Sequence, residues 1–462
     1  MGRQKILCEV RNVLLAGTRL FLPALTLITL GACARTDGAE PASITVTEVV
    51  PRQASAEGVD LSCSEDSAEP RYGYTYHGAD GNRRVDGSGS LPKISPIDIR
   101  LEFVPEWIAA VAVDCGSIWA AISAQGDVSA FFLQGADATR VVIEPVSLAA
   151  GQPPLLQVSG VDVSLVEAPA DSASTATHPI VIEQSGDLIW IDGQGDLVLN
   201  GGVDEIRLFV NVLPDARILQ DEHQRLLMLS APTDRYDHGV LGDGIEAGTI
   251  TLVETTPEFR IAGIVAAPEG TVIEGIMPLW SDLNDDGKRE IIITASDHRS
   301  GARLLVYSEA GELLASSDAI GQGYRWRHQI AVASPSEGQP PEIISVRTPH
   351  IGGSLEYFRL EGERLRLIVA LEGVTSHVIG TRNLDLALAG DFDGDGQIET
   401  LLPDTPMQKL VAVQRSGDDA DVDWWLPLGG TMSTNLAAVT DAKGRVSIGV
   451  GVESGKLRIW SP

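Results

Sequence analysis

The chain has 462 residues, of which 44% are hydrophobic, 5% aromatic and 21% charged, so its composition is that of a folded protein with room for two or three domains. Its formal net charge is −30. A chain this acidic lacks the basic face that nucleic-acid phosphates require, and we expect no nucleic-acid partner. The same sign disfavours direct adsorption to anionic lipid and leaves cations or basic partners as the natural counter-charges.

Residues 1–32 have the features of a targeting segment. Basic residues precede an uncharged run, residues 20–32, that is too short to span a bilayer as a helix. The run leads into "LGAC", residues 30–33, which resembles the lipobox of a bacterial lipoprotein signal peptide. The resemblance implies cleavage before Cys33, a lipid on Cys33 that anchors the protein in a membrane of the bacterial cell envelope, and a preference for the outer membrane because Ala34 follows. The alternative is an ordinary secretory signal with a coincidental cysteine.

The remaining cysteines agree with export. Cys8 would leave with the signal, and Cys63 and Cys115 are then the two left over. In an oxidising compartment we expect them to form a disulfide, the alternative being two free buried thiols.

Composition divides the rest of the chain. Residues 33–58 are small and polar and suit a flexible tether. Residues 59–167 contain short alternating runs such as "VSAFFL" and are interpreted as a small β domain. Residues 168–178 have the composition of a linker. Residues 179–462 have the texture of repeats.

The repeat consists of an apolar strand, a polar turn and a second apolar strand. "PLWSDLNDDGKREIIITAS" (278–296) and "LALAGDFDGDGQIETLLP" (386–403) show it most clearly, and two copies without the acidic residues follow the same outline. Asp282, Ser334, Asp391 and Asp441 mark the four turns at intervals of about fifty residues, which is typical of a four-stranded propeller blade. A third strand follows each copy, including "RLLVY" and "KLRIW".

The sequence therefore predicts an all-β protein in which a β-propeller of four-stranded blades follows a small β domain. The last repeat stops at Pro462 without a fourth strand. Because an unpaired edge is unfavourable, we expect a strand from the start of the propeller, within 179–193, to complete it. The length permits five or six blades, or seven if some are short or if the preceding domain contributes.

The two acidic turns have the pattern of a calcium loop. An EF-hand would need Glu at position twelve between two helices, whereas here that position is Ile293 or Leu402 and both flanks are strands. Oxygens at alternating positions of a tight turn can converge on one cation, and Gly287 and Gly396 permit the sharp backbone. The predicted ligands of about two Ca²⁺ sites, counting the carbonyls of Lys288 and Gln397, are Asp282, Asn284, Asp286, Lys288 and Glu290, and Asp391, Asp393, Asp395, Gln397 and Glu399. The alternative is two acidic turns that bind no ion.

These turns resemble the calcium-binding FG-GAP or VCBS repeats of integrin α-chain propellers. The resemblance covers roughly residues 214–462 and implies that the ions stiffen blade loops remote from any chemistry.

A second group of residues consists of histidines and arginines near blade junctions. Because equivalent positions in successive blades surround one axis, we predict that they line a channel mouth that binds an anionic ligand or an acidic protein loop. The alternative is that they hydrogen-bond strand ends or pack between blades. The group comprises His238, Arg325, Arg327, His328, His350, His377 and Arg382.

Two classes of function fit these features. One is a lipid-anchored, calcium-stabilised binding or scaffolding module of the cell envelope with a protein or envelope-polymer partner. The other is a propeller enzyme, a hydrolase or lyase acting on an envelope phosphoester or polysaccharide. The sequence contains no G-x-S-x-G, Walker, H-E-x-x-H or C-x-x-C motif, which favours the first class.

Overall fold

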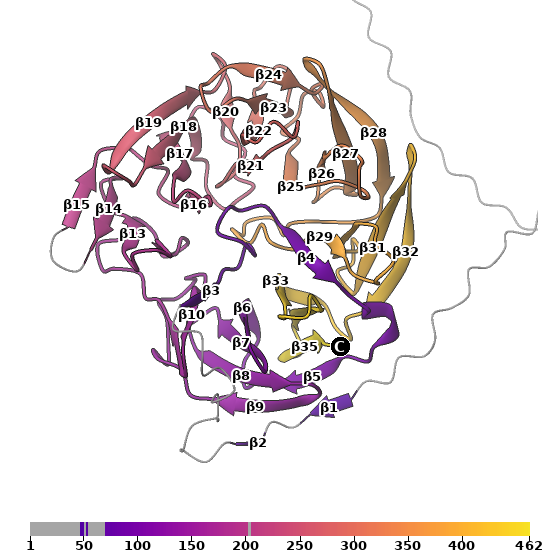
Figure 1. Ribbon diagram of the computed structural model, residues 1–462. Helices are drawn as coiled ribbons and strands as arrows, with labels where there is room; N and C mark the ends of the chain where they lie inside the picture. Colours follow the sequence, from indigo (N-terminus) through magenta and orange to yellow (C-terminus); the bar gives the residue numbers. More distant parts are fainter. Residues whose placement is uncertain (1–46, 50–51, 54–69, 202–204) are drawn as a thin grey trace, which may run out of the picture. The chain divides into compact units, whose positions relative to one another are not determined.

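The second strands of the repeats are apolar and buried along their whole length. In the computed structural model, which describes residues 47–49, 52–53, 70–201 and 205–462, Glu290–Ser296 (β22) and Val446–Val452 (β34) are buried at every position. Outer strands such as Arg364–Glu372 (β28) are largely exposed. A strand that is buried on both faces must lie between neighbouring sheets, as in a propeller. The sheets surround a common axis (Figure 1), which confirms the predicted all-β propeller.

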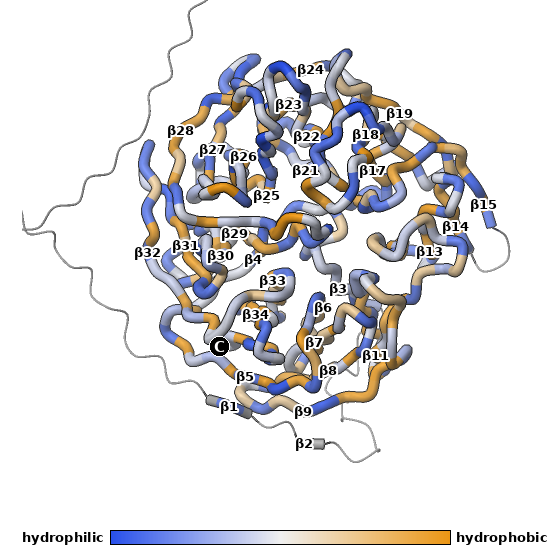
Figure 2. The backbone as a smooth tube through the Cα atoms, turned by 180° about the vertical axis from the view of Figure 1, so that it is seen from behind, coloured by the Kyte–Doolittle hydropathy of each residue, from blue (hydrophilic) through white to orange (hydrophobic). Residues whose placement is uncertain are grey.

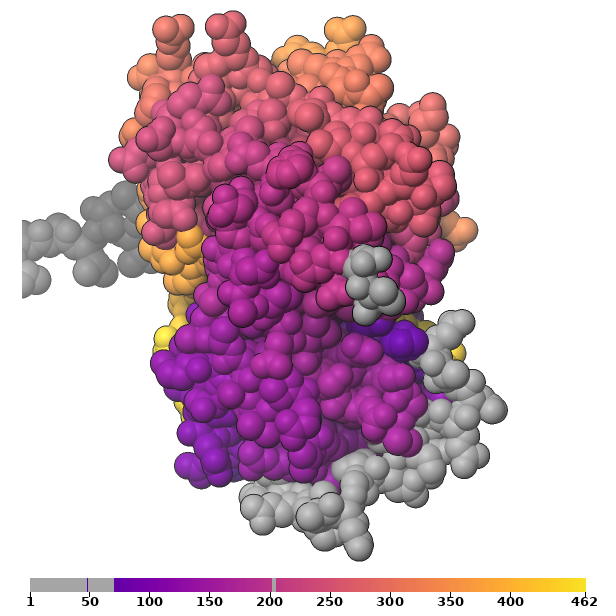
Figure 3. Space-filling view, turned by 90° about the vertical axis from the view of Figure 1, so that its left-hand side faces the viewer, coloured from indigo at the N-terminus to yellow at the C-terminus, as the bar shows by residue number. Residues whose placement is uncertain are grey.

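The described strands make eight blades. Five of the six sheets are one blade each, and the 13-stranded sheet contains three blades joined in succession, partly through Val272–Ile273 (β20). Blades that follow one another in the sequence lie side by side (Figure 3).

The first four blades are built from the following strands. Blade 1 has Pro105–Val113 (β6), Gly116–Ser123 (β7), Val128–Gln134 (β8) and Asp137–Val141 (β9). Blade 2 has Arg71–Gly73 (β3), Leu156–Ser159 (β10) and Asp162–Leu165 (β11). Blade 3 has Ile180–Val181 (β12), Leu188–Ile191 (β13), Leu197–Asn200 (β14) and Glu205–Leu208 (β15). Blade 4 has Leu219–Gln220 (β16), Leu226–Thr233 (β17), Glu246–Glu254 (β18) and Arg260–Ala266 (β19).

The other four blades contain the predicted repeats. Blade 5 has Leu279–Ser281 (β21), β22, Arg303–Tyr307 (β23) and Leu313–Ser316 (β24). Blade 6 has Arg327–Ala333 (β25), Glu342–Arg347 (β26), Ser354–Glu361 (β27) and β28. Blade 7 has Leu388–Asp391 (β29), Glu399–Pro403 (β30), Lys409–Ser416 (β31) and Asp419–Pro427 (β32), with Arg84–Ser88 (β4) beside β29. Blade 8 has Met432–Thr440 (β33), β34, Lys456–Trp460 (β35) and Ile97–Arg100 (β5).

The strand that closes the ring comes from far earlier in the chain than predicted. β5 pairs antiparallel with β35, with Ile97 opposite Ile459, and so supplies the missing fourth strand of blade 8. The expected segment, 179–193, instead forms the first two strands of blade 3. An earlier strand completes the last blade, as predicted. The predicted segment was wrong, because β5 lies in the region that the sequence analysis interprets as a separate domain.

The predicted domain boundaries also differ from the structure. Residues 59–167 contribute blades 1 and 2 together with β4 and β5, and Pro41–Pro462 form one unit rather than a small domain followed by a propeller. This contribution raises the number of blades above the predicted five to seven. The predicted linker is packed into the ring, since His178 is buried and the hydroxyl of Thr177 donates to the carbonyl of Ala216 at 2.8 Å.

Part of the predicted tether pairs with the outside of the ring. Thr47–Val49 (β1) runs parallel to β5, and Arg52–Gln53 (β2) runs parallel to β9. The predicted signal peptide and Cys33 lie outside the described residues, as does Cys63. Cys115 is disulfide-bonded, and its predicted partner Cys63 is thus not described. No helix in the part of the chain that is described is long and apolar enough to cross a membrane.

Residues 74–83, here called the crossing segment, run across the axis from β3 in blade 2 to β4 in blade 7 (Figures 1 and 2). The side-chain amide of Asn82 makes two 3.1 Å hydrogen bonds to the backbone of Val332 in β25. The carbonyl of Ala79 accepts from the amide of Gln220 in β16 at 2.8 Å. The crossing segment therefore bonds to the inner strands of separate blades.

A buried ionic cluster fixes the end of the crossing segment. Arg83 pairs with Asp385, and Arg217 donates to both oxygens of the same carboxylate at 2.8 and 2.5 Å. The two arginines hold the pKa of Asp385 below its usual value in spite of burial. Removing one member of such a cluster would leave an uncompensated buried charge, so the cluster ties the crossing segment to blades 4 and 7.

Candidate metal centre

Both predicted acidic turns join the innermost strand of a blade to its second strand. One joins β21 to β22 in blade 5 and the other joins β29 to β30 in blade 7. Consecutive turns of an antiparallel sheet lie at alternate ends of its strands, so all turns of this type share one face of the ring. Among the described residues, the other turns of this type are at 114–115 in blade 1, 182–187 in blade 3, 221–225 in blade 4, 334–341 in blade 6 and 441–445 in blade 8.

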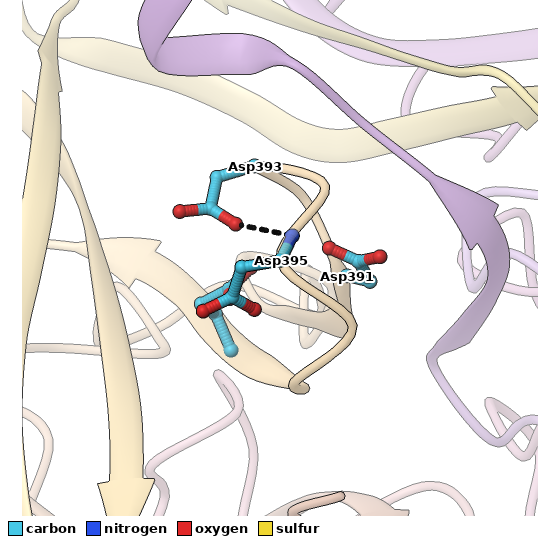
Figure 4. Close-up of side chains that lie close together, drawn as sticks. Asp391, Asp393 and Asp395 are labelled. Carbon is cyan, nitrogen blue, oxygen red and sulfur yellow. Dashed lines mark hydrogen bonds between the residues drawn. The ribbon is translucent and has the colours of Figure 1, made fainter. Parts of the chain in front are cut away.

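The turn of blade 7 gathers four carboxylates. Oxygens of Asp391, Asp393, Asp395 and Glu399 all lie within 4.8 Å of one another, and this is the one such group of His, Cys, Asp or Glu among the described residues. Figure 4 shows the three aspartates on successive bends of the turn, where Oδ1 of Asp393 accepts from the amide of Asp395 at 3.0 Å. Hard oxygen donors at this spacing are the ligands that Ca²⁺ prefers.

Glu399 is the most deeply buried member of the group. Its Oε2 accepts from the amide of Phe392 at 2.7 Å, whereas its Oε1 is buried and has no hydrogen-bond partner. Burial, reinforced by the neighbouring aspartates, raises the pKa of Glu399 to about 8. An unpaired buried carboxylate oxygen is costly, and a cation among the four side chains would satisfy it.

The turn of blade 5 has the same hydrogen bonds at its end but satisfies its own carboxylates. Oε2 of Glu290 accepts from the amide of Leu283 at 2.8 Å, as Glu399 does in blade 7. Its Oε1, however, accepts from the side-chain amide of Asn284 at 3.2 Å. Oδ2 of Asp282 accepts from the amide of Gly287, in the same turn, at 2.9 Å. The structure thus brings together the predicted ligands of blade 7 more closely than those of blade 5.

The backbones of the two turns agree position by position. Gly287 and Gly396 have φ angles of 79° and 84°, the left-handed region that the sequence predicts for them. Asp285 and Gly394 are also left-handed, at 58° and 87°. The amides of Lys288 and Gln397 follow each bend and donate to Asp286 and Asp395, both at 2.8 Å.

Two other turns on this face carry a cation of their own. In blade 8, Arg445 donates from Nε to Oδ2 of Asp441 at 2.8 Å. In blade 4, Arg225 donates from Nε to Oδ2 of Asp221 at 2.7 Å. In both turns Oδ1 of the leading aspartate accepts from the amide four residues later. The guanidinium therefore neutralises the leading aspartate of each of these turns, as an added cation would neutralise Asp391.

The segment that follows β4 holds the turn of blade 7 from the other side. The amide of Gly89 donates to the carbonyl of Asp391 at 2.7 Å, and that of Leu91, in the 3-10 helix Leu91–Lys93 (η2), donates to the carbonyl of Phe392 at 3.0 Å. Nζ of Lys93 donates to the carbonyl of Asp393 at 3.1 Å. No sequence signal connects residues about 300 positions apart, so this support could not be predicted.

Three of the predicted channel-mouth histidines come together on the opposite face. His328 stacks on Trp326 with ring centroids 4.7 Å apart, and Nε2 of His350 lies 2.7 Å from Nδ1 of His377. Burial lowers the pKa of His328, lowers that of His350 to about 4 and lowers that of His377 to about 3. These imidazoles are neutral at pH 7 and supply no charge to an anion. Trp326, which organises them, was not among the predicted residues.

The other predicted residues of this group are engaged elsewhere. Nε of Arg327 pairs with Glu356 at 2.7 Å in the interior, and His238 pairs with Glu274. Nε of Arg382 pairs with Asp215 at 2.6 Å, and a second nitrogen pairs with Asp243. Arg325 is exposed. These contacts correspond to the alternative in which the side chains bind strand ends and pack between blades.

Comparisons with known proteins add nothing to the fold that the strands establish. No family model and no curated protein matches the sequence. Among solved structures, a europium-containing methanol dehydrogenase is similar with a TM-score of 0.47 and 11% sequence identity, over 85% of this chain and 91% of that chain. A likeness this distant carries no information on activity, and the resemblance to FG-GAP or VCBS repeats stays a prediction.

Proposed function

We propose that this protein is a calcium-stabilised β-propeller that acts as a binding or scaffolding module of the bacterial cell envelope, anchored by a lipid on Cys33. The observation that carries the calcium site is the convergence of carboxylate oxygens of Asp391, Asp393, Asp395 and Glu399 to within 4.8 Å of one another, together with a buried oxygen of Glu399, Oε1, that has no partner. Carboxylates this close repel one another unless they bind a cation or take up protons.

Calcium at this site would stiffen a turn that is already held by residues 89–93, because the ion would bind the side chain of Asp391, whose carbonyl accepts a hydrogen bond from Gly89. The role is therefore to hold loops in place, and the binding surface lies elsewhere on the ring. A candidate surface is a cavity of about 1070 Å³ beside the crossing segment, on the face of the metal turns. Five of its lining residues are acidic and two are arginines, which favours a basic or polyhydroxylated partner: Asp80, Asp86, Glu183, Asp221 and Glu222, and Arg84 and Arg289.

Calorimetric titration of calcium into the purified protein beginning at Ala34 tests the site. We expect a dissociation constant of roughly 0.1 to 1 mM, as in extracellular calcium modules. At a hundred times that concentration the ion should add about 2.7 kcal/mol to the free energy of unfolding. Asp391→Asn should abolish the tightest binding event, and Asp441→Asn, at the arginine-paired turn, should leave it intact. Absence of heat and of any thermal shift with calcium would sink the proposal.

The anchor and the binding role need separate measurements. Incorporation of a clickable fatty acid that is lost on Cys33→Ala supports the anchor, and equal labelling of both proteins refutes it. A lysine-rich peptide should bind the purified protein and lose affinity when Glu183 and Glu222 are both changed to Gln. Unchanged affinity would show that the acidic cavity is not the binding surface.

A further inference from the structure

A second cavity lies on the face opposite the metal turns. Its volume is about 850 Å³, within the range of small-molecule sites. It is lined by turns that join second to third strands or one blade to the next, including Gln125, Thr381, Met407 and Thr431. These turns belong to blades 1, 7 and 8 and to the connection that leads into blade 7, so the cavity sits where the two ends of the propeller meet.

The wall combines an apolar surface with a few polar groups. Val104, Pro105, Leu386, Met407 and Met432 supply the apolar part. Such a lining removes the body of an organic ligand from water, while a small number of polar groups determine its orientation. Among these polar groups, Glu106 and Trp107 stand at the start of β6, the inner strand of blade 1.

Two polar atoms of this wall have no partner. Oε2 of Glu106 and Nε1 of Trp107 are both buried without a hydrogen bond. A buried donor or acceptor left unpaired costs about 1 to 3 kcal/mol, and a ligand in the cavity that both residues line would satisfy these two atoms. The carboxylate accepts hydrogen bonds and the indole donates one, so the ligand that satisfies both must carry a donor and an acceptor.

The charge of the wall favours a cationic ligand. The guanidinium of Arg382, at the edge of the cavity, is already paired with Asp215 and Asp243. Within the described residues, neither Glu106 nor Glu453, the two carboxylates of the lining, lies within 4.0 Å of a basic side chain. The unneutralised charge of the wall is therefore negative, and the net charge of −30 concentrates cations around the protein.

We propose that this cavity binds a small organic cation with an apolar body, whose ammonium group pairs with Glu106 and whose hydroxyl or carbonyl oxygen accepts from the indole of Trp107. The site is independent of calcium, because it shares no residue with the metal turns and lies on the other face of the ring.

Three probes with the same aromatic body and different charge test the proposal: tyramine (cationic), tyrosol (neutral) and para-hydroxyphenylacetate (anionic). Calorimetry and ligand-observed NMR on the purified protein, with calcium present, should rank tyramine at least tenfold tighter than the anion, with tyrosol between them. Glu106→Gln should remove most of the preference for the cation. Glu102→Gln is the matched control, since Glu102 is exposed nearby and does not line the cavity.

Two further readouts keep the proposal falsifiable if Glu106→Gln perturbs folding. Tyramine should shift one indole N–H resonance of nitrogen-15-labelled protein, and that resonance should be missing in Trp107→Phe. Val378→Trp, placed at the partly exposed rim, should fill the cavity and weaken all three probes. Equal affinities for the three probes, binding unaffected by Val378→Trp, or no detectable binding of tyramine would each overturn the proposal.

Discussion

Arg445 donates to Asp441 at 2.8 Å in blade 8, in a turn that occupies the same place as the turn led by Asp391 in blade 7. An arginine four residues later neutralises the leading carboxylate in the first case. In the second case, no ion pair of Asp391 is found among the described residues, and this is where we propose a calcium ion.

Arg445→Gln and Asp391→Asn should therefore respond differently to a chelator. The ion pair of Arg445 is partly exposed, so its loss should lower the free energy of unfolding by at most about 1 kcal/mol, equally with calcium and with chelator. Asp391→Asn should lower stability in calcium and have little effect in chelator. Thermal unfolding of both variants under both conditions measures this, and a chelator-dependent effect of Arg445→Gln would contradict the assignment.

Asn284 should set the affinity of the turn in blade 5. Its side-chain amide donates to Glu290 at 3.2 Å and so stabilises the turn without an ion. Asn284→Asp replaces that donor with a carboxylate, which should lower the melting temperature in chelator and tighten calcium binding severalfold. Calorimetry in an Asp391→Asn background isolates this turn. Asn284→Ala is the control, and it should destabilise the protein without any gain in affinity.

Glu246 should make stability fall with rising pH. It is buried on β18, and burial together with the charge of Glu274 raises its pKa to about 9. Since the unfolded carboxyl ionises near its ordinary pKa of 4.5, the folded state holds one more proton between these values. The free energy of unfolding then decreases with pH by on the order of 1 kcal/mol per unit in that window.

Glu246→Gln removes this titration. Compared with the parent protein, the variant should gain stability progressively from pH 5 to pH 8.5 in urea unfolding experiments. The exposed Glu258 provides a control, because Glu258→Gln should leave the slope unchanged. A constant difference between Glu246→Gln and the parent across this range would show that Glu246 does not titrate as described.

A chain that begins at Pro179 should fail to fold, although the sequence suggests a domain boundary there. Such a chain lacks blades 1 and 2, the crossing segment and β5, so blade 8 would lose its outer strand and Asp385 would lose Arg83. We expect aggregation or a broad thermal transition, compared with a single cooperative one for a chain beginning at Ala34. A soluble protein with a sharp transition from residue 179 onward would refute the eight-blade closure.

The repeats in the second half of the chain were predictable because their signals are local. "RLLVY" and "KLRIW" coincide with β23 and β35, and the acidic turns lie where the spacing placed them. Their glycines have the expected left-handed backbone. Residue type and short spacing determine each of these features.

The first half of the chain could not be assigned in this way. Blades 1 and 2 lack acidic turns, and blade 2 takes its inner strand, β3, from residues more than eighty positions before β10. The pairing of β5 with β35 and the contact of Lys93 with the turn of blade 7 depend on distances in space that no local pattern encodes. The difference between Glu399 and Glu290 depends on one side-chain amide, Asn284, whose donor role is visible only with coordinates.

The pairing of β5 with β35 also governs the order of events during synthesis. β5 is made about 360 residues before its antiparallel partner β35. The crossing segment is made early too, and the inner strands of blades 4, 6 and 7 must assemble around it. Contacts this distant in sequence form slowly. The nascent chain therefore has to hold β5 without its antiparallel partner while the roughly 360 residues between them are made.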